Sequence, residues 1–303
     1  MLSYIIFYII TLLLIPIFDV ILKNIKNILN GRKLLSIFQT YYDLIKLFKK
    51  DNFKSEFTSF ISFIAPIIIL AVSLIFLFFI PIVNSSITIS IIVIFHILGL
   101  SSVFLMLYWL DNVTYFWWLW AAREAFVLAI VEPVTLLLIL WFVIIAWWNT
   151  DMLSIQNFIN SNSSYLLALF LSILAITLFA ILLAENKRFP FDNPSTHLEL
   201  TMIHEAMLLE TTWPQLAIME LASKITLIWF VNLIVFLIWT NWYWITNDIY
   251  LYLLYVWKVI IILGILWFFE VFITKMRIFK YQNVFWFLLI LQVITIAFYL
   301  LNN

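Results

Sequence analysis

The sequence predicts an all-α polytopic membrane protein with about eight transmembrane helices, and three observations support this fold class. Of its 303 residues, 66% are hydrophobic and only 11% are charged, whereas a soluble domain carries about 25% charged residues. The apolar residues recur in runs of about 20, the length that crosses a hydrocarbon core of about 30 Å. These runs are continuous rather than alternating, which excludes a transmembrane β-barrel.

Charge and cysteine content exclude several classes of function. The formal net charge is zero, so no nucleic-acid partner is expected. The chain has no cysteine, which excludes disulfides and cysteine-ligated iron–sulfur clusters within it. The first 22 residues lack a basic leader and a small-residue cleavage site, so we interpret them as a first helix rather than a signal peptide. We expect residues 1–303 to form one integral membrane domain.

Eight apolar runs define the expected membrane spans. They cover residues 2–22, 57–83, 87–110, 125–148, 164–184, 215–240, 249–273 and 283–301. The links at 84–86, 149–163 and 241–248 contain no Lys or Arg, whereas the other four links contain 14 of the 16 basic residues. Because basic links face the cytoplasm, this alternation predicts a multi-pass protein of the cytoplasmic (inner) membrane. Both termini would lie outside, and segments 23–56 and 185–214 would be cytoplasmic.

Segment 23–56 predicts an amphipathic helix lying in the membrane interface. Its apolar residues recur at helical spacing: Leu34, Ile37, Phe38, Tyr41, Leu44, Ile45 and Phe48. Lys33, Lys46, Lys49 and Lys50 lie between them, an arrangement typical of interfacial helices. Two interpretations remain open: a surface helix beside the lipid bilayer, or a docking surface for a peripheral subunit.

Ionisable residues inside spans are costly and are therefore candidates for function. Glu132 is followed by Pro133, which removes a backbone hydrogen bond and favours a kink. A carboxylate beside a free carbonyl suits a proton relay, and Glu124 lies two turns earlier. The alternative is a static ion pair between Glu132 and a basic group such as Lys258. Lys258 and Glu270 are about 18 Å apart along one helix, so each needs a partner on another element.

The stretch from Ala184 to Glu210 concentrates polar chemistry in an otherwise apolar chain. It holds the carboxylates of Glu185, Asp192, Glu199, Glu205 and Glu210, two histidines, and the Lys187-Arg188 pair. Thr196-His-Leu-Glu199 fits a helix capping box, so Glu199 has a structural alternative. His197 and His204 lack the spacing and the further ligand of a zinc site. We predict no metal site and no catalytic residue in this chain.

The same stretch resembles a known family. Ala184-Glu-Asn-Lys-Arg-Phe-Pro-Phe-Asp-Asn-Pro194 is similar to the A-E-x-x-R-x-P-x-D-x-P loop in the quinone-site membrane subunit of complex I. The continuation to Glu210, with its two histidines, resembles the branch in energy-converting [NiFe] hydrogenases: formate hydrogenlyase subunit 4 and hydrogenase-4 component C. Further matching segments are Asn30-Gly-Arg-Lys, Arg123-Glu124, Glu132-Pro133 and Lys275-Met-Arg-Ile-Phe-Lys280.

This resemblance implies a non-catalytic membrane subunit that anchors a peripheral redox arm and passes its energy to ion-pumping subunits. The proton relay would comprise Glu132, Glu185, Glu199, Glu205, Glu210, Glu124, Lys258 and Glu270. The loop would be ordered, and the arm docked, by Arg188, Asp192, Arg123, His197 and His204. The expected partners are the large and small hydrogenase subunits, antiporter-like membrane subunits and the lipid bilayer. Their nickel–iron centre and iron–sulfur clusters would lie outside this chain, which would bind no cofactor itself.

The sequence departs from the family pattern in its first cytoplasmic segment. Lys33-Leu34-Leu35 stands where the family usually has Gly-Pro, and Thr40 stands where it has Pro after Gln. In complex I this segment helps to form a quinone site. Two alternatives therefore remain beside the hydrogenase interpretation: the quinone-site subunit of an NADH-quinone oxidoreductase, and an autonomous ion transporter. A transporter predicts repeated halves and glycine-broken helices, and this sequence has neither.

Overall fold

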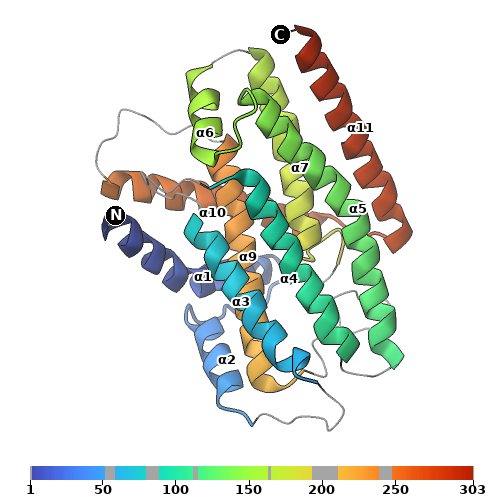
Figure 1. Cartoon of the computed structure of the whole chain (residues 1–303). Helices are drawn as coiled ribbons and strands as arrows, with labels where there is room; N and C mark the ends of the chain where they lie inside the picture. Colours follow the sequence, from blue (N-terminus) through green and yellow to red (C-terminus); the bar gives the residue numbers. More distant parts are fainter. Residues whose placement is uncertain are drawn as a thin grey trace.

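The predicted fold class is confirmed by the structure, a computed structural model that describes residues 2–51, 59–79, 89–111, 115–162, 165–192, 211–238 and 248–302. Within these ranges the chain is helical apart from loops and one isolated bridge between Ser90 and Asp151. Figure 1 shows the helices as a single bundle. The elements are α1 Leu2–Leu29, α2 Gln39–Phe48, α3 Ile61–Phe79, α4 Ile91–Asp111, α5 Tyr115–Ile145, α6 Met152–Ser161, α7 Tyr165–Glu185, α9 Trp213–Ile238, α10 Asp248–Phe272 and α11 Ile278–Asn302.

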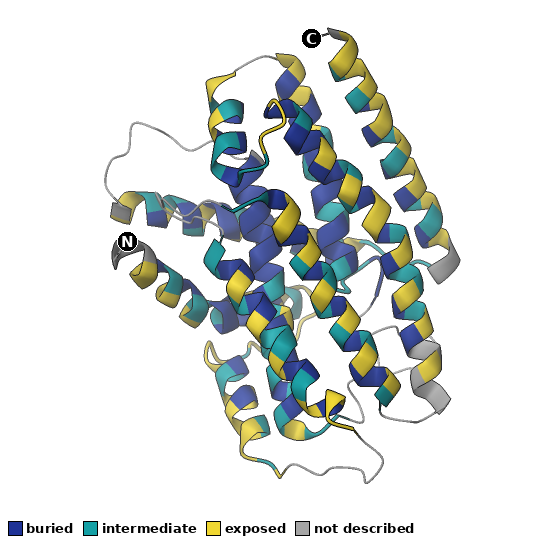
Figure 2. Ribbon diagram, viewed as in Figure 1, coloured by how far each residue is buried: buried dark blue, intermediate teal, exposed yellow. Residues whose placement is uncertain are grey.

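Eight of the described helices are long and apolar enough to cross a membrane, as predicted. They are α1, α3, α4, α5, α7, α9, α10 and α11. Figure 2 shows exposed residues along the outer faces of these helices. Many of them are large hydrophobic side chains, as expected for helices in contact with lipid. The chain is therefore a multi-pass membrane protein.

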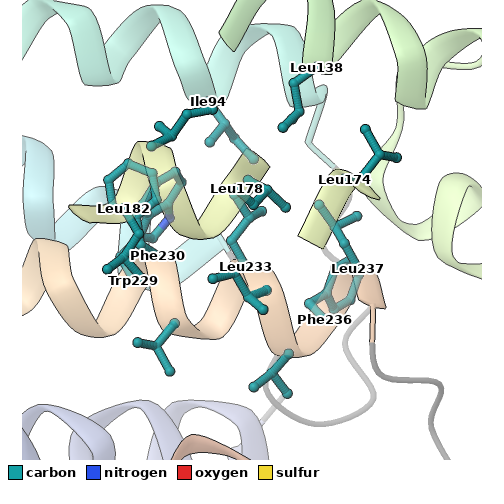
Figure 3. Packing of buried hydrophobic residues seen from close by; sticks show 14 of the residues in the cluster. Ile94, Leu138, Leu174, Leu178, Leu182, Trp229, Phe230, Leu233, Phe236 and Leu237 are labelled. Atoms are coloured by element: carbon teal, nitrogen blue, oxygen red, sulfur yellow. The ribbon is translucent and has the colours of Figure 1, made fainter. Parts of the chain in front are cut away.

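Helix α9 is the centre of the bundle. It contacts α1, α2, α3, α6, α7 and α10, and 72% of its most apolar window is buried, against 22% for α11. A helix that is hydrophobic on all sides is expected in the interior, and α9 carries apolar residues around its whole circumference from Ile225 to Leu237. In Figure 3, Trp229, Phe230 and Leu233 of α9 pack beside Leu178 and Leu182 of α7.

The helix ends differ from the predicted spans where polar residues continue a helix. Helix α1 runs to Leu29 rather than to residue 22, and α5 begins at Tyr115 rather than at 125. The predicted link 149–163 contains α6, which is too short to cross a membrane and packs through Met152, Ile155 and Ile159. In the described part of segment 23–56, residues 23–51, the surface helix is α2, where Thr40 and Leu44 are buried and Ile45 is exposed.

Three helices end in the same backbone motif, a residue with positive φ that closes the last turn. The residues are Gly31 after α1, Trp147 after α5 and Lys187 after α7. After α7, the Arg188 N–H donates to the Leu183 carbonyl at 2.9 Å and the Lys187 N–H donates to the Ala184 carbonyl at 3.1 Å. This pair of bonds is the Schellman motif, which satisfies the last carbonyls of a helix. It turns the chain sharply into the polar loop.

Candidate functional site

The loop at 186–192 is held by ion pairs to distant helices. The Arg188 guanidinium donates to the Glu270 carboxylate on α10 at 2.9 Å. Asp192, which is 1% exposed, pairs with Lys275 at 2.6 Å, just beyond the end of α10. Charged hydrogen bonds of this kind are stronger than neutral ones. These pairs tie Arg188 to α10 and Asp192 to the segment after it, and the loop-ordering role that the resemblance implied for them stays a prediction.

Backbone contacts fix the second half of this loop against the start of α11. The Met276 N–H donates to the Pro190 carbonyl at 2.8 Å, and the Tyr281 hydroxyl donates to the Phe191 carbonyl. The Phe191 ring packs edge-on against Tyr281 and beside Phe285. The peptide bond between Phe189 and Pro190 is cis. The loop is thus attached to α10, to the segment after it and to α11.

A cavity of about 640 Å³ opens beside the loop. Its wall is formed by the end of α1, the segment after it, residues 186–192, the first half of α9 and the end of α10. Ten of its seventeen lining residues are charged. Its apolar lining is limited to Leu22, Leu35 and Met219. Such a wall suits water, ions and polar groups rather than an apolar ligand.

The cavity floor is a network centred on Asp19 of α1. Its carboxylate lies 2.9 Å from the Lys23 ammonium and 4.0 Å from that of Lys224 on α9. The Thr40 hydroxyl of α2 donates to the same carboxylate at 3.2 Å, and Lys224 also pairs with Glu220 at 3.1 Å. These residues were not predicted from the sequence to belong to the site. The i,i+4 spacing of Asp19–Lys23 and of Glu220–Lys224 could have indicated these ion pairs in the sequence.

A second group of carboxylates lies where α5 meets the end of α7. Glu124 is 4% exposed and pairs with Lys187 at 2.9 Å. Glu185, the last residue of α7, interacts electrostatically with Glu124, Glu132 and Lys187. Glu124, Glu132 and Glu185 thus lie on two neighbouring helices, and their shared role in a relay stays a prediction.

Glu132 lies on the exposed face of α5, near the middle of the span Ala121–Ile145. Within the described chain it forms no ion pair, so the alternative interpretation of a static pair with Lys258 is wrong. Lys258 is buried on α10. One turn away from it, the Tyr255 hydroxyl donates to Asn232 at 2.6 Å.

Glu270 has its partners on other elements, as expected from its separation from Lys258. It pairs with Arg188 at 2.9 Å and lies 3.9 Å from the Lys26 ammonium of α1. Arg123 is half-buried on α5. Glu199, Glu205, Glu210, His197 and His204 fall outside the described residues, so their assigned roles remain predictions. Among the described residues, no group of three His, Cys, Asp or Glu side chains could hold a metal ion.

The fold and the site together define a class: a polytopic membrane subunit whose charged loop and cavity lie at one end of its helices. The sequence profile of the family described as NADH dehydrogenase matches residues 4–300. The chain belongs to this family, and it is a complex I-like membrane subunit of a respiratory complex.

The solved structures include one of the same fold. It is a chain in the structure of the membrane-bound sulfane sulfur reductase, an archaeal respiratory membrane complex. The TM-score is 0.84 at 17% sequence identity, and the match covers 97% of each chain. At this identity the likeness concerns the fold alone. A search of curated proteins returned no match.

Proposed function

We propose that this chain is the membrane-anchor and energy-coupling subunit of a membrane-bound respiratory [NiFe] hydrogenase complex of the formate hydrogenlyase type. In this proposal it docks a peripheral redox arm at the charged loop and relays proton or charge coupling to antiporter-like subunits. It contributes no redox centre of its own. The observation that carries the proposal is the position of Glu124 on α5. It pairs with Lys187 of the loop at 2.9 Å, and it lies about two turns from Glu132 on the exposed face of the same helix.

The charges of the loop give a physical route for coupling. Arg188 and Asp192 are paired with Glu270 and Lys275, so a charge change in a docked arm would act on a connected set of ion pairs. Carboxylates that lie close together in a low dielectric titrate as a coupled group. A redox event near the loop would therefore shift proton occupancy at Glu185 and Glu132.

Glu132 provides the direct test of coupling. We expect Glu132→Gln to leave the complex assembled, because the exposed face of α5 keeps its shape, but to reduce proton movement per turnover at least tenfold. The measurement is ion translocation per turnover in proteoliposomes. Leu136→Met, one turn further along the same exposed face, is the matched control and should couple normally. Unchanged coupling in Glu132→Gln would remove the relay role.

The family's own description favours a second candidate, the quinone-site subunit of an NADH-quinone oxidoreductase. Such a subunit would accept a quinone headgroup at the cavity beside the loop. The cavity wall has ten charged residues and only three apolar ones, so it offers little surface to an isoprenoid tail. This lining favours the hydrogenase proposal.

Purification of the intact complex through a tag on this chain separates the two candidates. We expect mass spectrometry to find a large subunit with paired CxxC motifs, together with nickel in the preparation. A nickel-free arm with a flavin and an NADH-binding subunit would instead establish the quinone-site candidate. A chain that purifies alone and still moves ions would contradict both.

A further inference from the structure

A second, smaller cavity lies deeper between α3, α4, α7 and α9. Its volume is about 70 Å³, enough for a small ion with a few waters and far below the few hundred Å³ of a site for an organic ligand. It shares Asn186, Lys187, Met219 and Ser223 with the large cavity. The two cavities are therefore neighbours, and the smaller one lies on the membrane side.

The polar groups of this cavity present mainly oxygen acceptors. The Ser101 hydroxyl donates its hydrogen to the Leu98 carbonyl at 2.8 Å, and the Thr226 hydroxyl donates to Ala222 at 2.9 Å. The Asn186 amide donates to Leu182 at 3.0 Å. Because the two hydroxyl hydrogens are already used within their own helices, the hydroxyl lone pairs are what remains for the cavity. An acceptor-lined cavity selects cations and rejects anions.

Two further groups in the cavity lack partners. Ser102 is 7% exposed, and its hydroxyl makes no hydrogen bond to any residue that the structure describes. The Glu185 carboxylate, in the same wall, likewise forms no hydrogen bond or ion pair in the described ranges. A hydroxyl and a carboxylate without such partners leave oxygen lone pairs open to a ligand in the cavity. A bound cation would satisfy both.

The charged side chains around the smaller cavity also favour a bound cation. Lys187 is the basic residue of this wall, and its ammonium is directed to Glu124 at 2.9 Å. Glu185 is then the acidic side chain in the same wall. Divalent sites gather several carboxylates around one ion, but a single carboxylate lines this cavity. One carboxylate with several hydroxyls fits a monovalent cation.

We propose that the cavity between α4, α7 and α9 is a sodium-ion site, with Glu185 as its charged ligand and Ser102, Ser101 and Thr226 as hydroxyl ligands. The ion reaches the site from the large charged cavity, through the shared wall at Ser223. The site does not depend on which redox arm the subunit carries, so it extends beyond the proposed function.

Equilibrium binding of ²²Na⁺ to the purified complex tests this site without turnover. We expect Glu185→Gln to bind about one Na⁺ fewer per complex than the wild type, since glutamine keeps the shape but loses the charge. We expect Ser102→Ala to keep the stoichiometry and raise the Kd about tenfold, the effect of one lost ligand to a charged group. Ser172→Ala on the exposed face of α7 is the matched control and should bind as the wild type does.

The opposite results would overturn the site. If Glu185→Gln binds as many ions with the same Kd, the cavity holds only water and protons. If Glu185→Gln does not assemble, Ser102→Ala decides, and an unchanged Kd would exclude the hydroxyl ligand set. Because ion binding is measured at rest, its loss or absence leaves the Glu132 coupling test and the identification of the partner subunits unaffected.

Discussion

At the scale of single residues, the ion pair between Lys187 and Glu124 carries the clearest stability prediction. Both side chains are largely buried, and their charged atoms are 2.9 Å apart. Removing one partner of a buried pair leaves an uncompensated charge and costs about 3–5 kcal/mol. We therefore expect Lys187→Met to lower the melting temperature of the detergent-solubilised complex substantially.

The double variant Lys187→Met/Glu124→Gln is the control for this prediction. It removes both charges, so most of the lost stability should return. Lys187 also holds a positive φ, and Lys187→Gly would relax the backbone while removing the same charge. Equal melting temperatures for the single and double variants would show that the pair contributes little.

The residue types in the sequence indicated which side chains could belong to the site, but not which of them form ion pairs. Arg188 and Asp192 were predicted to order the loop, but their partners Glu270 and Lys275 were not predicted. Glu132 was correctly placed inside a span, but its exposure could not be predicted. Exposure depends on which neighbours cover α5, and one sequence carries no information on helix neighbours. The pairing of Glu270 with Lys26 was missed for the same reason.

At the scale of elements, the attachment of α2 depends on very few buried side chains. Leu44 is 7% exposed, whereas its neighbour Ile45 is 50% exposed. Truncating a buried leucine costs about 2–5 kcal/mol, which is large for a ten-residue helix that contacts only α1 and α9 extensively. We expect Leu44→Ala to release α2 locally and to speed tryptic cleavage at Lys46, Lys49 or Lys50.

Ile45→Ala is the adjacent control, because it removes similar apolar volume from the exposed face. Its cleavage rate in detergent should match that of the wild type, as measured by a time course on gels. Equal cleavage of both variants would mean that the contact through Leu44 does not hold α2 in place.

The ends of the helices were harder to predict from the sequence than the spans themselves. Gly31 is a signal for a helix C-terminus that can be recognised in sequence, and α1 does end beside it. Trp147 and Lys187 adopt the same left-handed conformation without being glycine. Non-glycine residues rarely do so, and here each lies in a last turn that is closed by a backbone hydrogen bond, from Trp148 to Val143 and from Arg188 to Leu183. Helix α6 was missed because ten half-polar residues carry too weak a periodic signal.

At the scale of the whole molecule, the span count followed from hydropathy because every span must satisfy its own backbone in lipid. The same constraint made α9 recognisable by its apolar residues on all sides, although only the structure showed that six helices surround it. The orientation of the bundle rests on the distribution of Lys and Arg and remains a prediction. It places the loop at 185–214 in the cytoplasm and both termini outside.

Single cysteines test this orientation, because the chain has none of its own. Lys49→Cys and Asn149→Cys introduce exposed thiols near opposite ends of the predicted spans. On intact cells, a membrane-impermeant maleimide should label Asn149→Cys and spare Lys49→Cys until the cells are opened. The reverse labelling pattern would invert the topology.

The charged cavity also shapes how the molecule experiences the membrane voltage. A cavity of about 640 Å³ lined by ten charged residues is hydrated, so its floor at Asp19 and Lys224 has nearly the electrical potential of the adjoining aqueous phase. Across a full membrane, one elementary charge gains about 2.3 kcal/mol per 100 mV. We expect the drop to be steeper across the thinner apolar layer beyond the cavity. Lys258, which is buried on α10, would experience more of this drop than the ion pairs of the loop.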